Sequence, residues 1–263
     1  MTARRALRSV VTILVSVYAV IAVFGLFFAD RLIFRPHPSS YHDAGNIIKL
    51  RSGASTISAV FLPNPAARYT ILYSHGNAED IGDLLPMLET MQRSGFAVLA
   101  YDYKGYGTSG GRSSERSAYE DEDAAYDYLV TSARIPANRI IVLGRSLGGA
   151  MAIDLARRRP VAALIVQSSF ITAFRAMTTV PIVPFDEFRS DDKIGQVHCP
   201  VLVIHGTDDA VIPLRHGQRL FRDANNPKRS WWVAGAGHDD LPDVAGARYF
   251  ATVRQFADSL GAR

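Results

Sequence analysis

The stretch from Ile140 to Gly149 constrains the fold of this 263-residue chain more than any other. Its first four residues, 140–143, are isoleucine, valine and leucine, a run typical of a strand that is buried on both faces. Residues 144–148 then match the pattern Gly-x-Ser-x-Gly around Ser146, and residues 150–156 are rich in strong helix formers. The pentapeptide alone is a weak signal, because glycine and serine are common in turns. Between a strand and a helix, it predicts a strained turn that exposes the Ser146 hydroxyl as a nucleophile.

A nucleophilic serine needs a base, and the base needs an acid that orients it. Downstream of Ser146, the apolar run 201–204 leads into an acidic turn that contains Asp208 and Asp209. Further on, a second apolar run leads into His238, which follows Gly237. The acids and the histidine therefore follow the carboxyl ends of predicted strands, where open parallel sheets bind their ligands. We predict a triad of Ser146, His238 and one acid of the pair Asp208 and Asp209.

Five motifs spread over residues 30–260 together resemble the α/β-hydrolase superfamily. The resemblance is to its membrane-anchored branch, which is related to serine aminopeptidases and to protein-depalmitoylating hydrolases. The motifs are Ser74-His75-Gly76-Asn77-Ala78, Tyr101-Asp102-Tyr103-Lys104-Gly105-Tyr106-Gly107, Gly144-Arg145-Ser146-Leu147-Gly148, His205-Gly206-Thr207-Asp208-Asp209 and Gly237-His238.

The resemblance implies roles for particular residues. The acid of such hydrolases stands three residues after the glycine of its strand end, which selects Asp209 and leaves Asp208 as a turn residue that binds nearby backbone N–H groups. The N–H of Leu147, the residue after the nucleophile, is expected in the oxyanion hole. By resemblance, the backbone N–H of Asn77 is the second donor.

The remaining pattern predicts one α/β domain over residues 46–263, and 48% hydrophobic residues suffice for a large core. Apolar runs alternate with helical patterns, which predicts a mostly parallel eight-stranded sheet flanked by helices, the α/β-hydrolase fold of the resemblance. The strands are expected at 47–50, 57–62, 69–74, 96–101, 140–143, 162–167, 201–204 and 231–233. Residues 170–197 break the alternation and predict a short cap that lines an acyl pocket. Covering the core and facing a membrane remain alternatives for its apolar residues.

Three charged features are expected to be structural. The acidic cluster 120–123 lies in a helix predicted over 114–132, and such runs are usually a solvated helix face rather than a metal site. Asp102 and Lys104 are expected to brace their loop. Arg145 is expected to form a salt bridge near the edge of the sheet rather than to bind substrate.

The N-terminal region predicts attachment to a membrane. Residues 1–9 form a basic tail, and residues 10–29 contain no charged residue. About twenty apolar residues can cross a bilayer, so we expect a retained transmembrane signal anchor, followed by a linker over residues 30–45. A cleaved signal peptide is the main alternative. The positive charge before the apolar run favours a catalytic domain on the non-cytoplasmic side.

The composition gives no reason to expect nucleic acid, because the net charge is +4 and no basic stripe alternates with aromatic residues. Cys199 is the single cysteine, so the chain has no internal disulfide, and no Cys/His grouping has the spacing of a zinc site. We predict a serine hydrolase that needs no cofactor and cleaves an ester or thioester of a small-molecule or lipid-like acyl substrate. An aminopeptidase or other amide hydrolase and a non-catalytic binding protein of the same fold are the alternatives.

Overall fold

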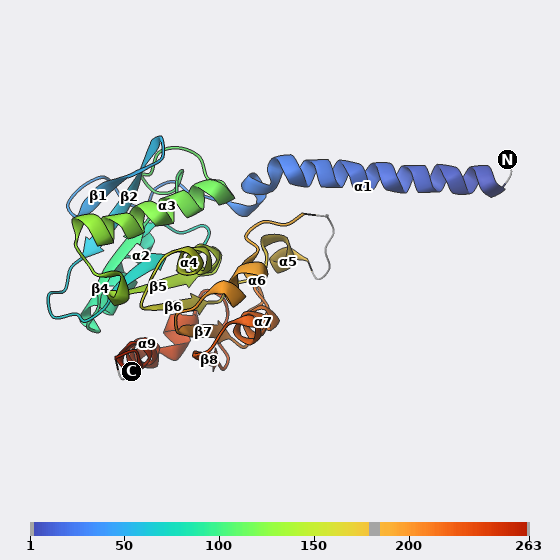
Figure 1. Ribbon diagram of the computed structural model, residues 1–263. Helices are drawn as coiled ribbons and strands as arrows, with labels where there is room; N and C mark the ends of the chain where they lie inside the picture. The colour runs from blue at the N-terminus through green and yellow to red at the C-terminus, as the bar shows by residue number, and fades with distance from the viewer. Residues whose placement is uncertain (1–2, 179–184, 262–263) are drawn as a thin grey trace.

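The computed structural model describes residues 3–178 and 185–261, without the side chains of residues 3–6, 21–24, 26–27 and 177. At its centre lies an eight-stranded sheet with the order β1-β2-β4-β3-β5-β6-β7-β8 (Figure 1). The strands are β1 (Ile47–Ser52), β2 (Ser55–Leu62), β3 (Thr70–Ser74), β4 (Ala97–Tyr101), β5 (Ile140–Arg145), β6 (Ala163–Gln167), β7 (Val201–Gly206) and β8 (Lys228–Val233). Strand β2 pairs antiparallel with β1 and β4, and all other neighbours pair in parallel. The predicted mostly parallel eight-stranded sheet is confirmed.

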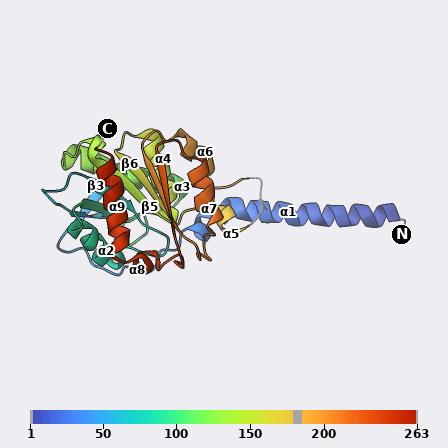
Figure 2. The same ribbon diagram turned by 90° about the horizontal axis from the view of Figure 1, so that it is seen from below.

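Helices cover both faces of this sheet (Figure 2). One face carries α2 (Ile81–Arg93), α8 (Leu241–Ala245) and α9 (Ala247–Ser259), and the other carries α3 (Glu115–Asp127), α4 (Leu147–Arg158) and α7 (Arg215–Asp223). Val142 and Leu143 are neighbours in β5, are both fully buried, and belong to the cores on opposite faces. A strand covered on both sides has no polar face, which explains the unbroken apolar run in its sequence.

The acidic segment of α3 corrects a prediction. The cluster 120–123 is expected to face solvent, but Asp121 and Glu122 are fully buried. Asp121 accepts hydrogen bonds from the Ser52 hydroxyl at 2.6 Å and from the Lys104 N–H at 2.8 Å, and Glu122 accepts one from the Ser74 hydroxyl at 2.8 Å. Burial raises the pKa of both carboxyls. The two positions lie on the inward face of the helix with buried alanines at 118 and 125, so helical spacing, and not the charge run, decides their environment.

The N-terminal helix α1 spans Ala3–Ile33 and projects away from the domain (Figure 1). It is longer than the predicted span of residues 10–29 and includes the start of the predicted linker. Among the described residues, no helix has the length and hydropathy required to cross a bilayer. The structure therefore does not support the predicted transmembrane segment, of which the side chains of 21–24, 26 and 27 lie outside the described residues.

The connection between β6 and β7 is the predicted cap, residues 170–197. It contains α5 (Ala173–Met177), α6 (Ser190–Lys193) and a 3₁₀ turn (Ile194–Gln196), and its residues 179–184 lie outside the described part of the chain. Phe188 is fully buried in the main core. Phe170 lines the catalytic cavity described below. The apolar residues of this connection therefore both cover the core and line a pocket.

Candidate active site

Ser146 lies in the turn between β5 and α4 with a φ of +51° and a ψ of −115°. Residues other than glycine rarely adopt a positive φ, so the surrounding structure must hold this conformation. A Cβ atom on Gly144 would lie 2.1 Å from the Gly148 carbonyl oxygen, and one on Gly148 would lie 2.0 Å from that of Ser74. These approaches require glycine on both sides of the serine, as the Gly-x-Ser-x-Gly pattern predicts.

The structure brings Ser146, His238 and Asp209 together at the carboxyl edge of the sheet. Ser146 Oγ lies 3.0 Å from His238 Nε2, and His238 Nδ1 lies 2.8 Å from Asp209 Oδ2. Because an ionised carboxylate only accepts hydrogen bonds, we assign the imidazole proton to Nδ1. His238 Nε2 is then free to accept the proton of the serine hydroxyl.

Asp209 is held as an anion. It is 5% exposed, and its Oδ1 accepts the backbone N–H groups of Val211 at 3.0 Å and Ile212 at 2.7 Å. Burial alone would raise the pKa of Asp209, but hydrogen bonds from His205, His238 and the Ile212 N–H outweigh burial and lower this pKa far below its usual range. A carboxylate that stays ionised can orient the imidazole and stabilise its cation.

The neighbouring acid, Asp208, is exposed and does not contact His238. Its carboxylate accepts a hydrogen bond from the Thr207 hydroxyl at 2.8 Å, and not from backbone N–H groups as predicted. The Thr207 hydroxyl in turn accepts the N–H of Gly235 at 2.9 Å, so the pair holds two adjacent loops together. Asp208 is thus a turn residue, although its contact differs from the predicted one.

The two predicted oxyanion donors line the same cavity, of about 410 Å³, as Ser146. Within the described residues, the backbone N–H groups of Asn77 and Leu147 form no hydrogen bond. Both groups can therefore bind a ligand in the cavity.

The side chain of Asn77 has a function that the sequence did not reveal. Its Nδ2 donates to the Ile33 carbonyl at 2.5 Å, and its Oδ1 accepts the Arg35 N–H at 2.9 Å and the Tyr106 hydroxyl at 2.5 Å. The amide thus fixes the Asn77 loop to the end of α1. No local pattern could have revealed these contacts, because Ile33 lies 44 residues before Asn77 in the chain.

Arg145 ties together two loops of the site. Its guanidinium lies 2.5 Å from Glu79 Oε2 and 2.6 Å from Asp239 Oδ1, and it also donates to the His238 carbonyl at 3.4 Å. Burial would lower the pKa of Arg145, but the attraction of Glu79 outweighs burial and raises it. The predicted salt bridge is confirmed. Arg145 joins the loop after β3 to the loop that carries His238.

The catalytic cavity has a largely apolar wall. The apolar residues are Leu32, Ile33, Ala78, Leu147, Phe170, Ala173, Ala176, Val211 and Ile212. They come from the end of α1, the loop after β3, the start of α4, the cap and the loop after β7. A larger cavity, of about 1070 Å³, lies between α1 and the loop 105–113 and is not lined by Ser146 or His238.

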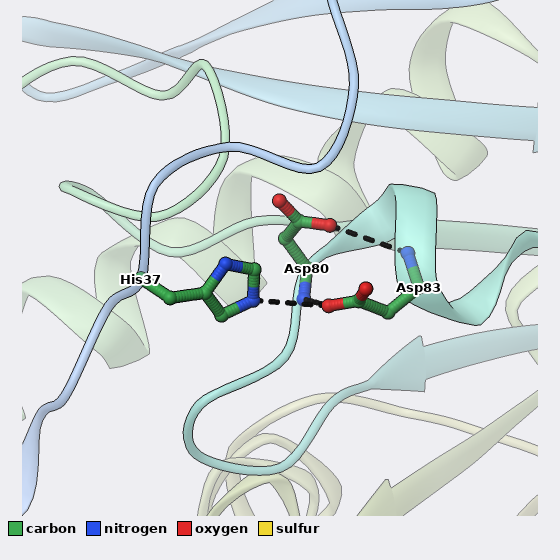
Figure 3. A group of neighbouring side chains, drawn as sticks. All are labelled: His37, Asp80 and Asp83. Carbon is green, nitrogen blue, oxygen red and sulfur yellow. Dashed lines mark hydrogen bonds and ion pairs between the residues drawn. The ribbon is translucent and has the colours of Figure 1, made fainter.

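One group in the described part of the chain, His37, Asp80 and Asp83, has the spacing of a metal site (Figure 3). The atoms that could bind a metal already form hydrogen bonds within the protein. His37 Nε2 lies 3.0 Å from Asp83 Oδ2, and its Nδ1 lies 2.6 Å from the next backbone carbonyl, so both nitrogens must be protonated. This backbone contact raises the pKa of His37. Asp80 caps α2 by accepting the Gly82 N–H at 2.9 Å, and it also accepts the Ser40 N–H at 2.8 Å. In this structure the group is an ion pair beside a helix cap.

Comparison with known proteins agrees with this architecture. Residues 65–185 match the family described as serine aminopeptidase, S33. The chain is 40% identical over 195 residues to α/β hydrolase domain-containing protein 17B of Xenopus laevis, which covers 73% of the chain and 67% of the relative. It is 37% identical over 209 residues to the human protein 17B, with coverages of 78% and 72%.

Solved structures share the fold at low sequence identity. The Pyrococcus furiosus esterase Pf2001 has a TM-score of 0.73 at 18% identity and covers 87% of this chain and 99% of its own. A monoacylglycerol lipase of Paleococcus ferrophilus has a TM-score of 0.63 at 19% identity, with coverages of 78% and 99%. These structures share the fold, and the relative that is 40% identical over 73% of the chain shows that the chain belongs to the α/β-hydrolase superfamily.

Proposed function

We propose that the protein is a serine hydrolase that cleaves a carboxylic ester or thioester through an acyl-enzyme, with Ser146, His238 and Asp209 as its triad. The observation that carries this proposal is the hydrogen-bonded chain from Asp209 through His238 to Ser146, which opens into a cavity with an apolar wall. Such a chain activates a hydroxyl, and such a wall suits an acyl group.

In the proposed mechanism, Ser146 Oγ attacks the acyl carbonyl while His238 Nε2 takes its proton. The negative oxygen of the tetrahedral intermediate accepts the N–H groups of Asn77 and Leu147, each worth about 3 to 4 kcal/mol in related sites. His238 then protonates the leaving alkoxide or thiolate. Water, activated by the same imidazole, attacks the acyl-enzyme and releases the acid together with free Ser146.

The cavity favours this reaction over aminopeptidase action. An aminopeptidase must bind the positive amino group of its substrate, which calls for a free carboxylate near the nucleophile. Among the described residues that line the cavity, the one carboxylate belongs to Asp239, and it pairs with Arg145 at 2.6 Å. Arg35 adds a second positive charge to the lining. An acyl group without an ammonium ion fits this lining better.

We also propose that α1 attaches the protein to a membrane, with the catalytic domain on the non-cytoplasmic side. Between Leu7 and Val20, nine large apolar side chains are each 47–68% exposed, an area that requires an apolar partner. Extraction of isolated membranes with alkaline carbonate tests the attachment, and release of the protein would contradict it. Protease digestion across an intact inner membrane tests the orientation, and a protected domain would contradict it.

The catalytic proposal is tested by labelling with a fluorophosphonate and by hydrolysis of matched ester, thioester and aminoacyl-amide substrates. We expect labelling and ester or thioester turnover in the wild type, and neither in Ser146→Ala. Loss of the nucleophile typically costs about four decades or more in rate. A folded Ser146→Ala protein with turnover near the wild-type value would overturn the proposal. Faster cleavage of the amide would assign the protein to the aminopeptidases.

A further inference from the structure

A smaller cavity, of about 220 Å³, lies beside the catalytic cavity and is strongly basic. Its lining includes Arg175 of α5 and, on α7, Arg215, Arg219 and Arg222. No carboxylate is among the described residues that line it. Arg219 and Arg222 share one acidic partner on α7, whereas Arg175 and Arg215 have no ion pair within the described part of the chain. The cavity thus holds uncompensated positive charge.

His216 supplies an unused hydrogen-bond donor to this cavity. It is 2% exposed, lies in the first turn of α7 and lines the cavity. Its Nδ1 lies 3.4 Å from the Ile171 N–H, which donates to it, so the ring proton resides on Nε2. Burial and the nearby cations Arg215 and Arg175 lower the pKa of His216 to about 4, so the ring is neutral at pH 7. Nε2 has no partner among the described residues, and a buried donor without one costs free energy.

The basic cavity and the catalytic cavity share two walls. Ala173 and Ala176 of α5 line the catalytic cavity, while Arg175 of the same helix lines the basic one. The segment after β7 does the same, because Ile212 of its loop lines the catalytic cavity and His216 of α7 lines the basic one. Figure 2 shows α5 next to α7 on the side of the domain from which α1 projects, and residues of both helices line the basic cavity. The two cavities are therefore neighbours, as a ligand that occupies both would require.

We propose that the basic cavity binds a phosphate group, and that during catalysis this phosphate belongs to the acyl substrate. Guanidinium groups match the geometry and charge of phosphate oxygens, and the free Nε2–H of His216 adds a neutral donor. The volume is below the range typical of sites for drug-sized ligands, so it suits one anionic group rather than a whole substrate. The substrate assignment rests on the proposed hydrolase activity, whereas phosphate binding does not.

Binding is tested by calorimetric titration of the full chain with inorganic phosphate. The test variant is Arg175→Gln/Arg215→Gln, which removes two exposed or half-exposed charges and leaves the core intact. The control is Arg139→Gln/Arg229→Gln, which removes two exposed charges at the amino ends of β5 and β8, on the opposite edge of the sheet. We expect one phosphate per chain, at least tenfold weaker binding in the test variant and unchanged binding in the control. Absence of binding, or an equal loss in the control, would overturn the site.

The source of the phosphate is tested with two esters that carry the same acyl chain, a 1-acylglycerol and its 3-phosphate. We expect the wild type and the control to prefer the phosphate-bearing ester at least tenfold in kcat/KM, through a lower KM. In the test variant, the ratio of the two kcat/KM values should fall close to one. Thermal unfolding of all three proteins shows whether each one is folded.

The two tests separate the two claims. If inorganic phosphate binds but the wild type shows no preference, the cavity binds free phosphate and the substrate assignment is wrong. If neither ester is hydrolysed, the substrate assignment fails together with the proposed function, while the titration still decides whether the cavity binds phosphate.

Discussion

Replacing Asp209 by asparagine tests the proposed triad most directly, because the backbone fixes how the new amide must lie. In the wild type, Oδ1 of Asp209 accepts two N–H groups, from Val211 and Ile212, and Oδ2 accepts the Nδ1–H of His238. An asparagine keeps both backbone contacts only if its oxygen stays at Oδ1. Its NH₂ group then faces His238.

The asparagine would force His238 into the tautomer that cannot accept the serine proton. An NH₂ group can only donate, so Nδ1 of His238 must become the acceptor and the ring proton must move to Nε2. Nε2 then presents a proton to Ser146 Oγ and cannot take one. The flipped amide would point its NH₂ group at two N–H donors, and each buried donor left unpaired costs about 1 to 3 kcal/mol. We expect kcat/KM to fall by about four decades, which corresponds to about 5.5 kcal/mol of lost transition-state stabilisation.

The assay is hydrolysis of an activated ester, with Asp208→Asn as the matched control. Asp208 is exposed and contacts the Thr207 hydroxyl, so its replacement should change the rate by about a factor of two. Thermal unfolding must show that both variants are folded. A folded Asp209→Asn enzyme within tenfold of the wild type, or an equal loss in Asp208→Asn, would refute the assignment of Asp209.

Three further predictions follow from the contacts around the site. Tyr106→Phe removes the hydroxyl that donates to the Asn77 side chain, so the loop that carries the proposed oxyanion donor is held less firmly and kcat should fall about tenfold. The control is Tyr126→Phe, at an equally buried tyrosine of α3, which should leave kcat unchanged. Burial raises the pKa of Asp102 to about 7. Between about pH 4 and pH 7, the folded protein therefore keeps a proton on this carboxyl that the unfolded chain releases. The contribution of Asp102 to the free energy of unfolding is complete below about pH 4 and is lost as the pH rises to 7. Between pH 5 and pH 8 the wild type should lose about 3 kcal/mol of unfolding free energy in this way, and Asp102→Asn should remove that loss in urea unfolding at the two pH values. Parallel pH curves for the wild type and the variant would contradict the burial argument. Gly148→Ala places a Cβ atom 2.0 Å from a backbone carbonyl oxygen and should lower the free energy of unfolding by about 3 kcal/mol or more. A variant with near-wild-type stability would show that the turn can relax.

The strands could be predicted because burial on both faces of the sheet makes several consecutive residues apolar. β5 and β7 are buried on both faces, so their residues 140–143 and 201–204 are all apolar, and these runs can be recognised without knowledge of the fold. The boundaries of helices are harder to predict from the sequence. Near the end of the chain, Gly246, with a φ of +55°, separates α8 from α9. An isolated glycine in a helical pattern does not reveal its φ, because a helix tolerates glycine at modest cost.

The residues of the proposed triad could be placed together from the sequence for a geometric reason. Ser146, Asp209 and His238 each follow a parallel strand, and parallel strands end at the same edge of the sheet. The contacts that support the site could not be predicted in this way. Arg175 and Arg215 lie in different helices, α5 and α7, and no sequence pattern indicates that both line one cavity. The hydroxyls of Ser52 and Ser74, which bind Asp121 and Glu122, lie 69 and 48 residues away from them in the chain, so the acidic run alone does not reveal that these two carboxyls are buried.

The segment that joins α1 to the domain is part of the active site rather than a passive linker. Leu32 and Ile33 line the catalytic cavity, and the backbone of residues 33 and 35 holds the Asn77 loop through its side chain. Phe34 is buried edge-to-face between two aromatic rings at 5.8 and 6.4 Å, and the His37 ion pair fixes the next turn to α2. Each hydrogen bond contributes about 1 kcal/mol, so the segment stays in place only while these contacts act together. Whatever α1 binds is therefore connected through rigid contacts to one of the two proposed oxyanion donors, and a displacement of the end of α1 would move that donor relative to Ser146.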